Sequence, residues 1–317
     1  MHLNVLRQFL LMPRPRISII GAGKIGSSTA LRIAEKELGD VVLVDIDDKL
    51  PRGEALDLMH SAPLAFDVNI SGSADYNDIK GSDIVIITAG RPRAPGMDRM
   101  DLLKTNAGIV KTICEKVREK APESIVIVVS NPMDMMTFVA YRTLGFPRER
   151  VLGENLLDSL RLSYIISREL GVSAKSVSSM VIGEHGETMV PLLSHSSVNG
   201  TPVSSLIPNE KHGELIDSVR KSAMDVIETK GATIFAPTLA IAHMAEAILR
   251  DKKSIMPVSA YLEGEYGAEG ICIGVPAKLG RKGIEEILRL ELSDKERESF
   301  QKSAEKIKGI VQEMQKE

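Results

Sequence analysis

The sequence contains no tryptophan, only 3% aromatic residues and only two cysteines among its 317 residues. Its core must therefore be built from aliphatic side chains. Cys114 and Cys272 lie far apart and form no metal-ligand spacing, so no metal site is expected. Buried free thiols in a reducing, cytoplasmic compartment suit this pair better than a disulfide does.

Neither charge nor hydropathy indicates a nucleic acid or a membrane as a partner. The formal net charge is only −3, which gives little attraction to an acidic surface. No apolar run reaches the roughly 18 residues that a membrane-spanning helix needs. The chain is 43% hydrophobic and 26% charged, as globular proteins usually are, and its length allows two domains.

The first twelve residues, MHLNVLRQFLLM, are apolar but lack the basic start and the small-residue cleavage site of a signal peptide. Met12 then opens the segment MPRPR, directly before a predicted strand. Residues 1–15 are therefore interpreted either as an extra N-terminal arm or as the result of a start codon assigned too early.

Short β-branched runs alternate with helical stretches along the first half of the chain. The runs at 17–20, 41–44, 83–88 and 124–129 are apolar on both faces, as in parallel strands covered by helices on each side. A helix is predicted over 24–38, directly after the first run. Strands joined by helices imply right-handed crossovers, so we predict an α/β fold with a doubly wound parallel sheet.

The pattern changes near Val151. A long helix, shorter strands around 177–182 and a helical C-terminus over 293–316 follow. We therefore expect residues 151–317 to form a C-terminal α+β domain that carries the substrate and the catalytic groups.

The segment GAGKIG, residues 21–26, has the spacing G-x-G-x-x-G between a predicted strand and a predicted helix. In such a turn Gly21 allows the tight bend, Gly23 lets the main chain approach a pyrophosphate, and Gly26 lets the helix pack on the strand. The helix N-terminus then offers free N–H groups to the phosphates. Residues 16–150 are thereby predicted to be a Rossmann domain that binds a dinucleotide.

Asp45 ends the next predicted strand, 19 residues after Gly26. A carboxylate at this place can accept hydrogen bonds from both adenosine ribose hydroxyls and repels a 2′-phosphate, so NAD is favoured over NADP. The alternative interpretation is a glycine-rich turn followed by a surface aspartate.

The segment TAGRPRAPGMDR, residues 88–99, follows the third buried strand, where open parallel sheets bind ligands. Its glycines and prolines indicate a candidate lid, and a helical run over 100–119 follows. Its three arginines suit two-point binding of carboxylates. Taken alone, arginines in a loop are more often solvated than functional.

Three further segments carry polar side chains at positions where a site could form. Asn131 stands just past a buried strand, although Asn-Pro also starts many helices. Asp158 and Arg161 share one helix face, as an ordinary surface ion pair also would. His185 lies between glycine-rich neighbours after a strand, in an open setting for an acid or a base.

These motifs, in this order and spacing, resemble the lactate/malate dehydrogenase family. The resemblance covers nearly the whole chain from Arg16 onward. It rests on GAGKIG, LVDID, TAGRPRAPGMDR, SNPMD, LLDSLR, IGEHGET, KGATIFAPT, PVSAYLEGEYG and IGVPAKLG.

The resemblance implies a role for each matching residue. His185 would exchange the hydroxyl proton of the substrate while a hydride moves between C2 and NAD, and Asp158 would orient the ring and raise its pKa toward neutrality. Arg161 would bind the C1 carboxylate, and Arg99 would close over the substrate and polarise the carbonyl oxygen.

Two more residues complete the implied substrate site. Asn131 would bond the C2 oxygen or the nicotinamide ribose, and Thr233 would line the pocket. The candidate cofactor contacts as a set are Gly21, Gly23, Lys24, Ile25, Gly26, Asp45, Thr88, Ala89, Gly90, Asn106, Val129 and Asn131.

Arg93 decides the expected substrate. In the family this position faces the substituent on C3, with Gln in lactate dehydrogenases and Arg in malate dehydrogenases. A buried guanidinium without a partner is costly, whereas a second carboxylate satisfies it with charge-assisted bonds. Such sites can reject an analogue that lacks the polar group by roughly 10⁴. The resemblance therefore implies reversible oxidation of a four-carbon 2-hydroxy dicarboxylate, malate, to oxaloacetate.

Two departures bear on the details. Glu184 directly before His185, and GENLL at 153–157 before Asp158, are typical of the lactate-dehydrogenase-like branch of malate dehydrogenases. That branch implies a homotetramer, a dimer of dimers, with a dimer as the alternative. Lactate or a broader range of 2-hydroxy acids is the alternative substrate. An NAD-binding protein without turnover is the alternative from another class, although its catalytic set should be broken.

Overall fold

A computed structural model of the chain describes residues 14–91 and 99–315, and the side chain of Arg99 lies outside this description. Six parallel strands form the first part of its main sheet, and they run in the spatial order β3-β2-β1-β4-β5-β6. Their bounds are β1 (Arg16–Ile20), β2 (Asp40–Val44), β3 (Ile70–Ser73), β4 (Ile84–Ile87), β5 (Ile125–Val128) and β6 (Val151–Glu154). This is the predicted doubly wound Rossmann arrangement, and the strand order reverses between β1 and β4.

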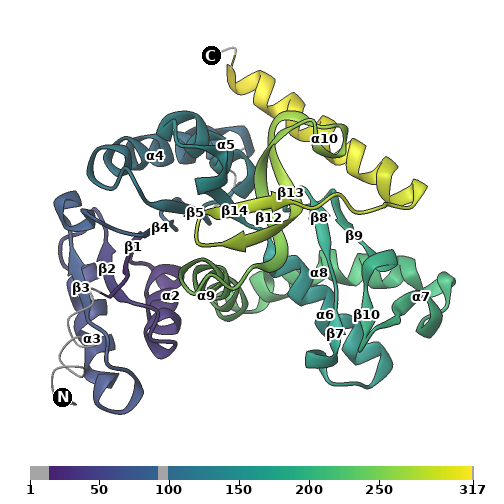
Figure 1. Cartoon of the computed structure of the whole chain (residues 1–317), viewed down its shortest axis with the longest axis horizontal. Helices are drawn as coiled ribbons and strands as arrows, with labels where there is room; N and C mark the ends of the chain where they lie inside the picture. Colours follow the sequence, from purple (N-terminus) through teal and green to yellow (C-terminus); the bar gives the residue numbers. More distant parts are fainter. Residues whose placement is uncertain (1–13, 92–98, 316–317) are drawn as a thin grey trace, which may run out of the picture.

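Four helices connect these strands: α2 (Lys24–Glu35), α3 (Leu50–Ala65), α4 (Arg99–Lys120) and α5 (Met133–Leu144). Figure 1 shows α4 and α5 on one side of the parallel strands, with α2 and α9 on the other. The strands are buried on both faces; the side chains of β4, for example, are inaccessible to solvent. Their uninterrupted Ile and Val content follows from this two-sided burial.

The helix expected over 24–38 ends earlier, at Glu35. Glu37 adopts a positive φ of 50°, which breaks the helical main chain. Two residues later, a Cβ at Gly39 would overlap the carbonyl oxygen of Pro15, so the chain passes close to the segment before β1 as it enters β2.

The C-terminal half adds antiparallel strands to the same sheet, which continues β6-β12-β13-β8-β9 with β14 paired to β13. These strands are β8 (Val181–Gly183), β9 (Met189–Pro191), β12 (Ser254–Glu263), β13 (Glu269–Gly280) and β14 (Gly283–Ile287). A separate small sheet contains β7 (Val177–Ser178), β10 (Ser197–Val198) and β11 (Thr201–Pro202). The helices are α6 (Leu156–Leu170), α7 (Val203–Leu206), α8 (His212–Lys230), α9 (Phe235–Leu249) and α10 (Asp294–Gln315).

Both halves therefore share one continuous sheet and one large aliphatic core. The core includes side chains from β1 and β4 as well as from β12, β13 and α10. A smaller apolar cluster lies mainly between α6 and α8 and includes Leu162, Ile166 and Leu215. The division into residues 16–150 and 151–317 stays a prediction. β6, which begins at Val151, pairs in parallel with β5, so the parallel sheet of the first half continues past the predicted boundary.

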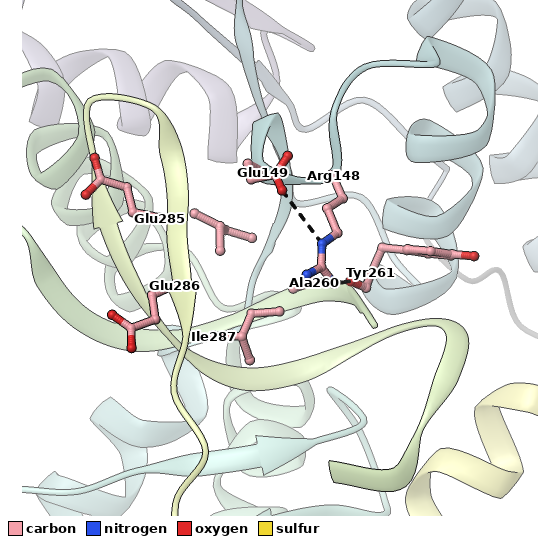
Figure 2. Close-up of a pocket in the computed structure, with 8 residues that line it drawn as sticks. Arg148, Glu149, Ala260, Tyr261, Glu285, Glu286 and Ile287 are labelled. Carbon is pink, nitrogen blue, oxygen red and sulfur yellow. Dashed lines mark hydrogen bonds and ion pairs between the residues drawn. The ribbon is translucent and has the colours of Figure 1, made fainter. Parts of the chain in front are cut away.

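Arg148, in the 3₁₀ turn η2 (Arg148–Arg150) just before β6, ties the two halves together. Its Nη1 donates to the carbonyl of Tyr261, at 3.2 Å, and to the carboxylate of Glu265, at 2.9 Å. Figure 2 shows Arg148 next to Tyr261 of β12 and joined to Glu149, in a small pocket that residues of β14 also line. A half-buried guanidinium with several carboxylate partners fixes how the antiparallel strands follow β6.

Candidate active site

The turn after β1 is packed closely on the protein side and open on the other. Gly21 has a φ of 107°, and a Cβ there would lie 2.7 Å from the main-chain nitrogen of Ala89. A Cβ at Gly26 would overlap the carbonyl oxygen of Gly21, whereas a Cβ at Gly23 would meet nothing within 4 Å. The turn therefore leaves free space at Gly23, at the N-terminus of α2, where a pyrophosphate fits.

Asp45 borders this turn from the end of β2. Its carboxylate accepts the N–H of Ala22, at 2.7 Å, and the N–H of Asp47, at 3.2 Å. The carboxylate thus lies beside the glycine turn at the carboxyl edge of the sheet. That is where the ribose of a dinucleotide bound along the turn would need an acceptor.

The loops after β4 and β5 meet next to the turn. The hydroxyl of Thr88 donates to the carbonyl of Gly21, at 3.0 Å. Asn106, buried on α4, accepts the N–H of Arg91, at 2.8 Å, and donates to the carbonyl of Asn131, at 2.7 Å. Asn106 therefore holds the two loops together, and its predicted contact with the cofactor stays a prediction.

The remaining predicted cofactor residues lie on the same edge of the sheet. Lys24 is exposed and Ile25 is half-buried, both in the first turn of α2. Ala89 and Gly90 directly follow Thr88 after β4, and Val129 follows β5, where its N–H donates to the carbonyl of Ile87, at 2.9 Å.

A hydrogen-bonded chain of three side chains forms the centre of the substrate half. His185 Nδ1 lies 2.8 Å from Asp158 Oδ2, and Arg161 Nη1 donates to Asp158 Oδ1, at 2.7 Å. Asp158 is 1% exposed, while His185 is 19% exposed at the site opening. A buried carboxylate on Nδ1 leaves Nε2 as the ring nitrogen available for proton exchange.

The sequence reaches this geometry through the first turns of α6 and the loop between β8 and β9. Glu154, the last residue of β6, accepts the N–H of Leu157, at 2.9 Å, and so caps the start of α6. The i, i+3 spacing then brings Asp158 and Arg161 onto the face that His185 approaches. The alternative of a solvated surface ion pair is wrong here, because both side chains are largely buried.

The charges of His185, Asp158 and Arg161 stabilise one another. Burial opposes protonation of His185, but Asp158, and beyond it Glu154 and Asp134, outweigh that effect and raise the pKa of His185 to about 9. Burial likewise opposes ionisation of Asp158, yet His185 and Arg161 hold the pKa of this carboxyl below its usual value. The site therefore favours an imidazolium beside a carboxylate.

Several residues that support His185 and its loop were not identified from the sequence. Asp134 Oδ2 accepts the main-chain N–H of His185, at 2.7 Å, and its Oδ1 accepts the hydroxyl of Ser259, at 2.6 Å. Lys306 of α10 donates to the carboxylate of Glu184, at 2.8 Å. Asp134 ends the SNPMD motif and Ser259 lies in the PVSAYLEGEYG segment, so both segments were singled out, although neither residue was; Lys306 lies in no such segment.

The other predicted substrate residues are only partly placed. Arg93 lies outside the described residues, and Arg99 is the first residue of α4 with its side chain outside them. Asn131 lies two residues before α5, and Thr233 is half-buried in the short loop between α8 and α9. The structure thus brings together His185, Asp158 and Arg161, and it leaves the approach of the two loop arginines as a prediction.

The described part of the chain contains neither a metal-ligand cluster nor a membrane-spanning helix. Among residues 14–91 and 99–315, no group of three or more His, Cys, Asp or Glu side chains could hold a metal ion. In the same part of the chain, no helix combines the length and the apolar composition needed to cross a bilayer.

Comparison with known proteins matches both halves of the chain to family models. Residues 15–153 match the lactate/malate dehydrogenase NAD-binding domain, and residues 156–317 match the lactate/malate dehydrogenase alpha/beta C-terminal domain. A curated malate dehydrogenase of Heliobacterium modesticaldum is 45% identical over 95% of this chain and 98% of its own length.

Solved structures give the same picture. Malate dehydrogenase from Salinibacter ruber is 39% identical with a TM-score of 0.91, over 95% of this chain and 98% of that one. Lactate dehydrogenase from Cryptosporidium parvum, complexed with lactic acid and the cofactor NAD, has the same identity, coverage and TM-score. Overall likeness of fold therefore does not separate the two substrates.

Proposed function

The chain belongs to the lactate/malate dehydrogenase family, and we propose that it catalyses the reversible oxidation of (S)-malate to oxaloacetate with NAD. It is an NAD-dependent oxidoreductase with a Rossmann domain and an α/β C-terminal domain. The catalytic assignment rests on three hydrogen-bonded side chains: Asp158 contacts His185 at 2.8 Å and Arg161 at 2.7 Å.

In this proposal His185 moves the proton. During oxidation of malate its Nε2 accepts the proton of the C2 hydroxyl, and during reduction of oxaloacetate the imidazolium returns it to the forming alkoxide. Asp158 keeps the ring in the orientation that presents Nε2 and stabilises the charged form. NAD, when bound along the glycine turn, supplies the acceptor for the hydride that leaves C2.

The arginines bind and polarise the substrate. Arg161, held in place by Asp158, binds the C1 carboxylate in a two-point contact. Arg99 polarises the C2 oxygen, and Arg93 binds the C4 carboxylate. Asn131 bonds the C2 oxygen or the nicotinamide ribose, and Thr233 lines the pocket.

The chemical argument for malate over lactate rests on Arg93, and the curated malate dehydrogenase that is 45% identical to this chain supports it. A methyl group at C3 would leave this guanidinium without a partner, whereas a carboxylate would pair with it. Lactate, or a broader range of 2-hydroxy acids, is the second candidate, because a lactate dehydrogenase is as similar to this chain as a malate dehydrogenase is.

The deciding experiment is NADH oxidation by the purified protein with oxaloacetate and pyruvate in parallel. A kcat/KM ratio that strongly favours oxaloacetate supports malate as the substrate and Arg93 as its selector. A ratio near one, or one that favours pyruvate, would move the chain to the second candidate. Absence of turnover with both would contradict the enzymatic proposal.

The finer cofactor preference is part of the proposal. Asp45 lies at the edge where the adenosine ribose would bind, and its negative charge disfavours a 2′-phosphate. We therefore expect NAD to be preferred over NADP, and parallel titration with NADH and NADPH, followed by nucleotide fluorescence, measures the margin.

We further propose a homo-oligomer, a dimer of dimers with a dimer as the alternative, in the cytoplasm. Large apolar side chains are exposed on several helices, among them Leu56 of α3 at 59% and Phe235 of α9 at 67%. Burying such side chains against another copy removes apolar surface from water. Sedimentation equilibrium gives the copy number directly. The two free buried cysteines fit a reducing compartment, which cell fractionation can test.

A further inference from the structure

Asp134 has no part in the proton or hydride transfer described above, although it belongs to the SNPMD motif. It stands in the first turn of α5 and is 3% exposed. Its carboxylate joins three segments that are far apart in the sequence: α5 itself, β12 through Ser259, and the loop between β8 and β9 through His185. One acceptor therefore fixes the main chain of the proposed catalytic histidine relative to both halves of the sheet.

The surroundings of this carboxylate make its charge effective. Asp134 and His185 line the same pocket, together with the apolar side chains Met100, Leu103, Ile307 and Ile310. Burial raises the pKa of Asp134 to about 6, against the opposing hydrogen bonds from Ser259 and His185. The group is therefore ionised at neutral and alkaline pH, and apolar walls weaken the screening of its field at the imidazole.

We propose that Asp134 is a positioning residue for the proton transfer: through Ser259 and the N–H of His185 it holds the catalytic loop, and its charge favours the imidazolium. This inference rests on the proposed function. It assigns to Asp134 both a geometric and an electrostatic effect, and the two can be separated by experiment.

His185 lies among charged groups from every element around it. In the described part of the chain these are Asp134 of α5, Glu154 of β6, Asp158 and Arg161 of α6, and, on its own loop, Glu184 with Lys306 of α10. Asp158 has the larger effect because it contacts the ring, and Glu184 is neutralised by Lys306. Loss of Asp134 should therefore lower the pKa of His185 without abolishing its elevation.

Three substitutions separate the effects. Asp134→Asn keeps an oxygen for the N–H of His185, and its amide can donate to the Ser259 hydroxyl, so the geometry is retained while the charge is lost. Asp134→Ala removes both. Ser259→Ala keeps the charge of Asp134 and removes one of the two hydrogen bonds that its carboxylate accepts.

The measurement is the pH profile of kcat/KM in both directions. Reduction of oxaloacetate needs the imidazolium, so its rate falls as pH rises through the pKa of His185; oxidation of malate needs the neutral ring and rises there. In Asp134→Asn both limbs should move to lower pH by about one unit. In Asp134→Ala the same shift should accompany a loss of kcat of about tenfold or more, because the loop is no longer held.

The control is Glu246→Gln, which removes another buried carboxylate, on α9, where Lys36 and Lys252 pair with it. This variant should lose stability and keep both pH limbs. Unshifted limbs in Asp134→Asn would overturn the inference, even if kcat fell, since a purely structural acceptor gives that result. If Asp134→Ala does not fold, Asp134→Asn and Ser259→Ala carry the test.

Failure of the proposed function is distinguishable from failure of this inference. Titration of the ring resonance of His185 by nuclear magnetic resonance requires no turnover, and His185→Asn identifies the signal among the six histidines. If the wild type turns over neither oxaloacetate nor pyruvate, the proposed function fails, while a lower pKa of His185 in Asp134→Asn still supports its coupling to Asp134. An equal pKa in both proteins would overturn the coupling regardless of activity.

Discussion

The two ends of the site are built in opposite ways. At the cofactor end, the important positions lack side chains: Gly21 and Gly26 permit close packing, and Gly23 leaves open space. At the substrate end, the important atoms are side-chain atoms, and they are held by other buried side chains. A dinucleotide needs room and main-chain N–H groups, whereas proton transfer needs one ring in one orientation with a tuned pKa.

The two ends are therefore sensitive to different changes. A single added methyl group can disrupt the cofactor end, because at Gly26 it would overlap the carbonyl oxygen of Gly21. The substrate end depends on charge and orientation, so an isosteric change that moves a proton or a charge should disable it without disturbing the fold.

The largest effect is expected from His185→Asn. The variant loses the proton donor and acceptor, and kcat should fall by about 10³-fold or more. NADH should still bind with nearly unchanged affinity, because the glycine turn follows β1, whereas His185 lies between β8 and β9. Stopped-flow turnover and NADH fluorescence titration measure the two quantities. Loss of NADH binding would contradict the separation of the two ends.

Arg93→Gln should change the choice of substrate while the fold and the cofactor affinity stay the same. Removing the guanidinium removes the partner of the C4 carboxylate and the penalty for a methyl group. The ratio of kcat/KM for oxaloacetate to that for pyruvate should fall by about 10²-fold or more. Arg91→Gln, two residues earlier, is the matched control. Equal ratios in wild type and Arg93→Gln would remove the argument for malate.

Two glycine substitutions sharpen the contrast within the cofactor end. A Cβ at Gly26 would overlap the carbonyl oxygen of Gly21, so Gly26→Ala should lower the stability of the fold by about 2 kcal/mol. Gly23→Ala places its methyl group in open space, so the Tm should be unchanged while NADH affinity falls. Thermal unfolding with and without NADH tests both. A fall in Tm for Gly23→Ala without nucleotide would contradict the assignment of that space to the cofactor.

The smallest effect is expected from Asp45→Ala. Loss of the carboxylate should weaken NADH binding by about tenfold and narrow its margin over NADPH. Asp45 also accepts the N–H of Ala22, so Asp45→Asn is needed beside it to retain an acceptor for the turn. If Asp45→Asn binds NADH and NADPH with the affinities of the wild type, the carboxylate does not recognise the ribose.

The outcome of the sequence predictions follows the same division. The glycine turn, the apolar strands and Asp45 form local patterns of periodicity and spacing, and these predicted the Rossmann half and its cofactor. The catalytic set needed the resemblance as well, since His185 lies far from Asp158 in the sequence and the local interpretation of Asp158 and Arg161 was a surface pair. Only burial distinguishes that pair from an exposed one.

The supporting residues were beyond the reach of local patterns. Ser259 lies inside a buried strand, and Lys306 lies on a C-terminal helix with many other charged residues. Local patterns in these neighbourhoods indicate neither the hydrogen bond from Ser259 to Asp134 nor the one from Lys306 to Glu184. The contact of Ser259 with Asp134 depends on the pairing of β12 with β6, and the contact of Lys306 with Glu184 depends on the packing of α10; each joins residues more than one hundred positions apart.

The doubly wound sheet and the dinucleotide turn could be predicted from the sequence, because both depend on side-chain periodicity and on glycines whose neighbours lie close along the chain or in adjacent strands. The tertiary structure decided the state of the catalytic histidine. Asp158, Asp134 and Glu154 come from separate elements, and only their convergence in a buried site, where charges interact strongly, favours the imidazolium.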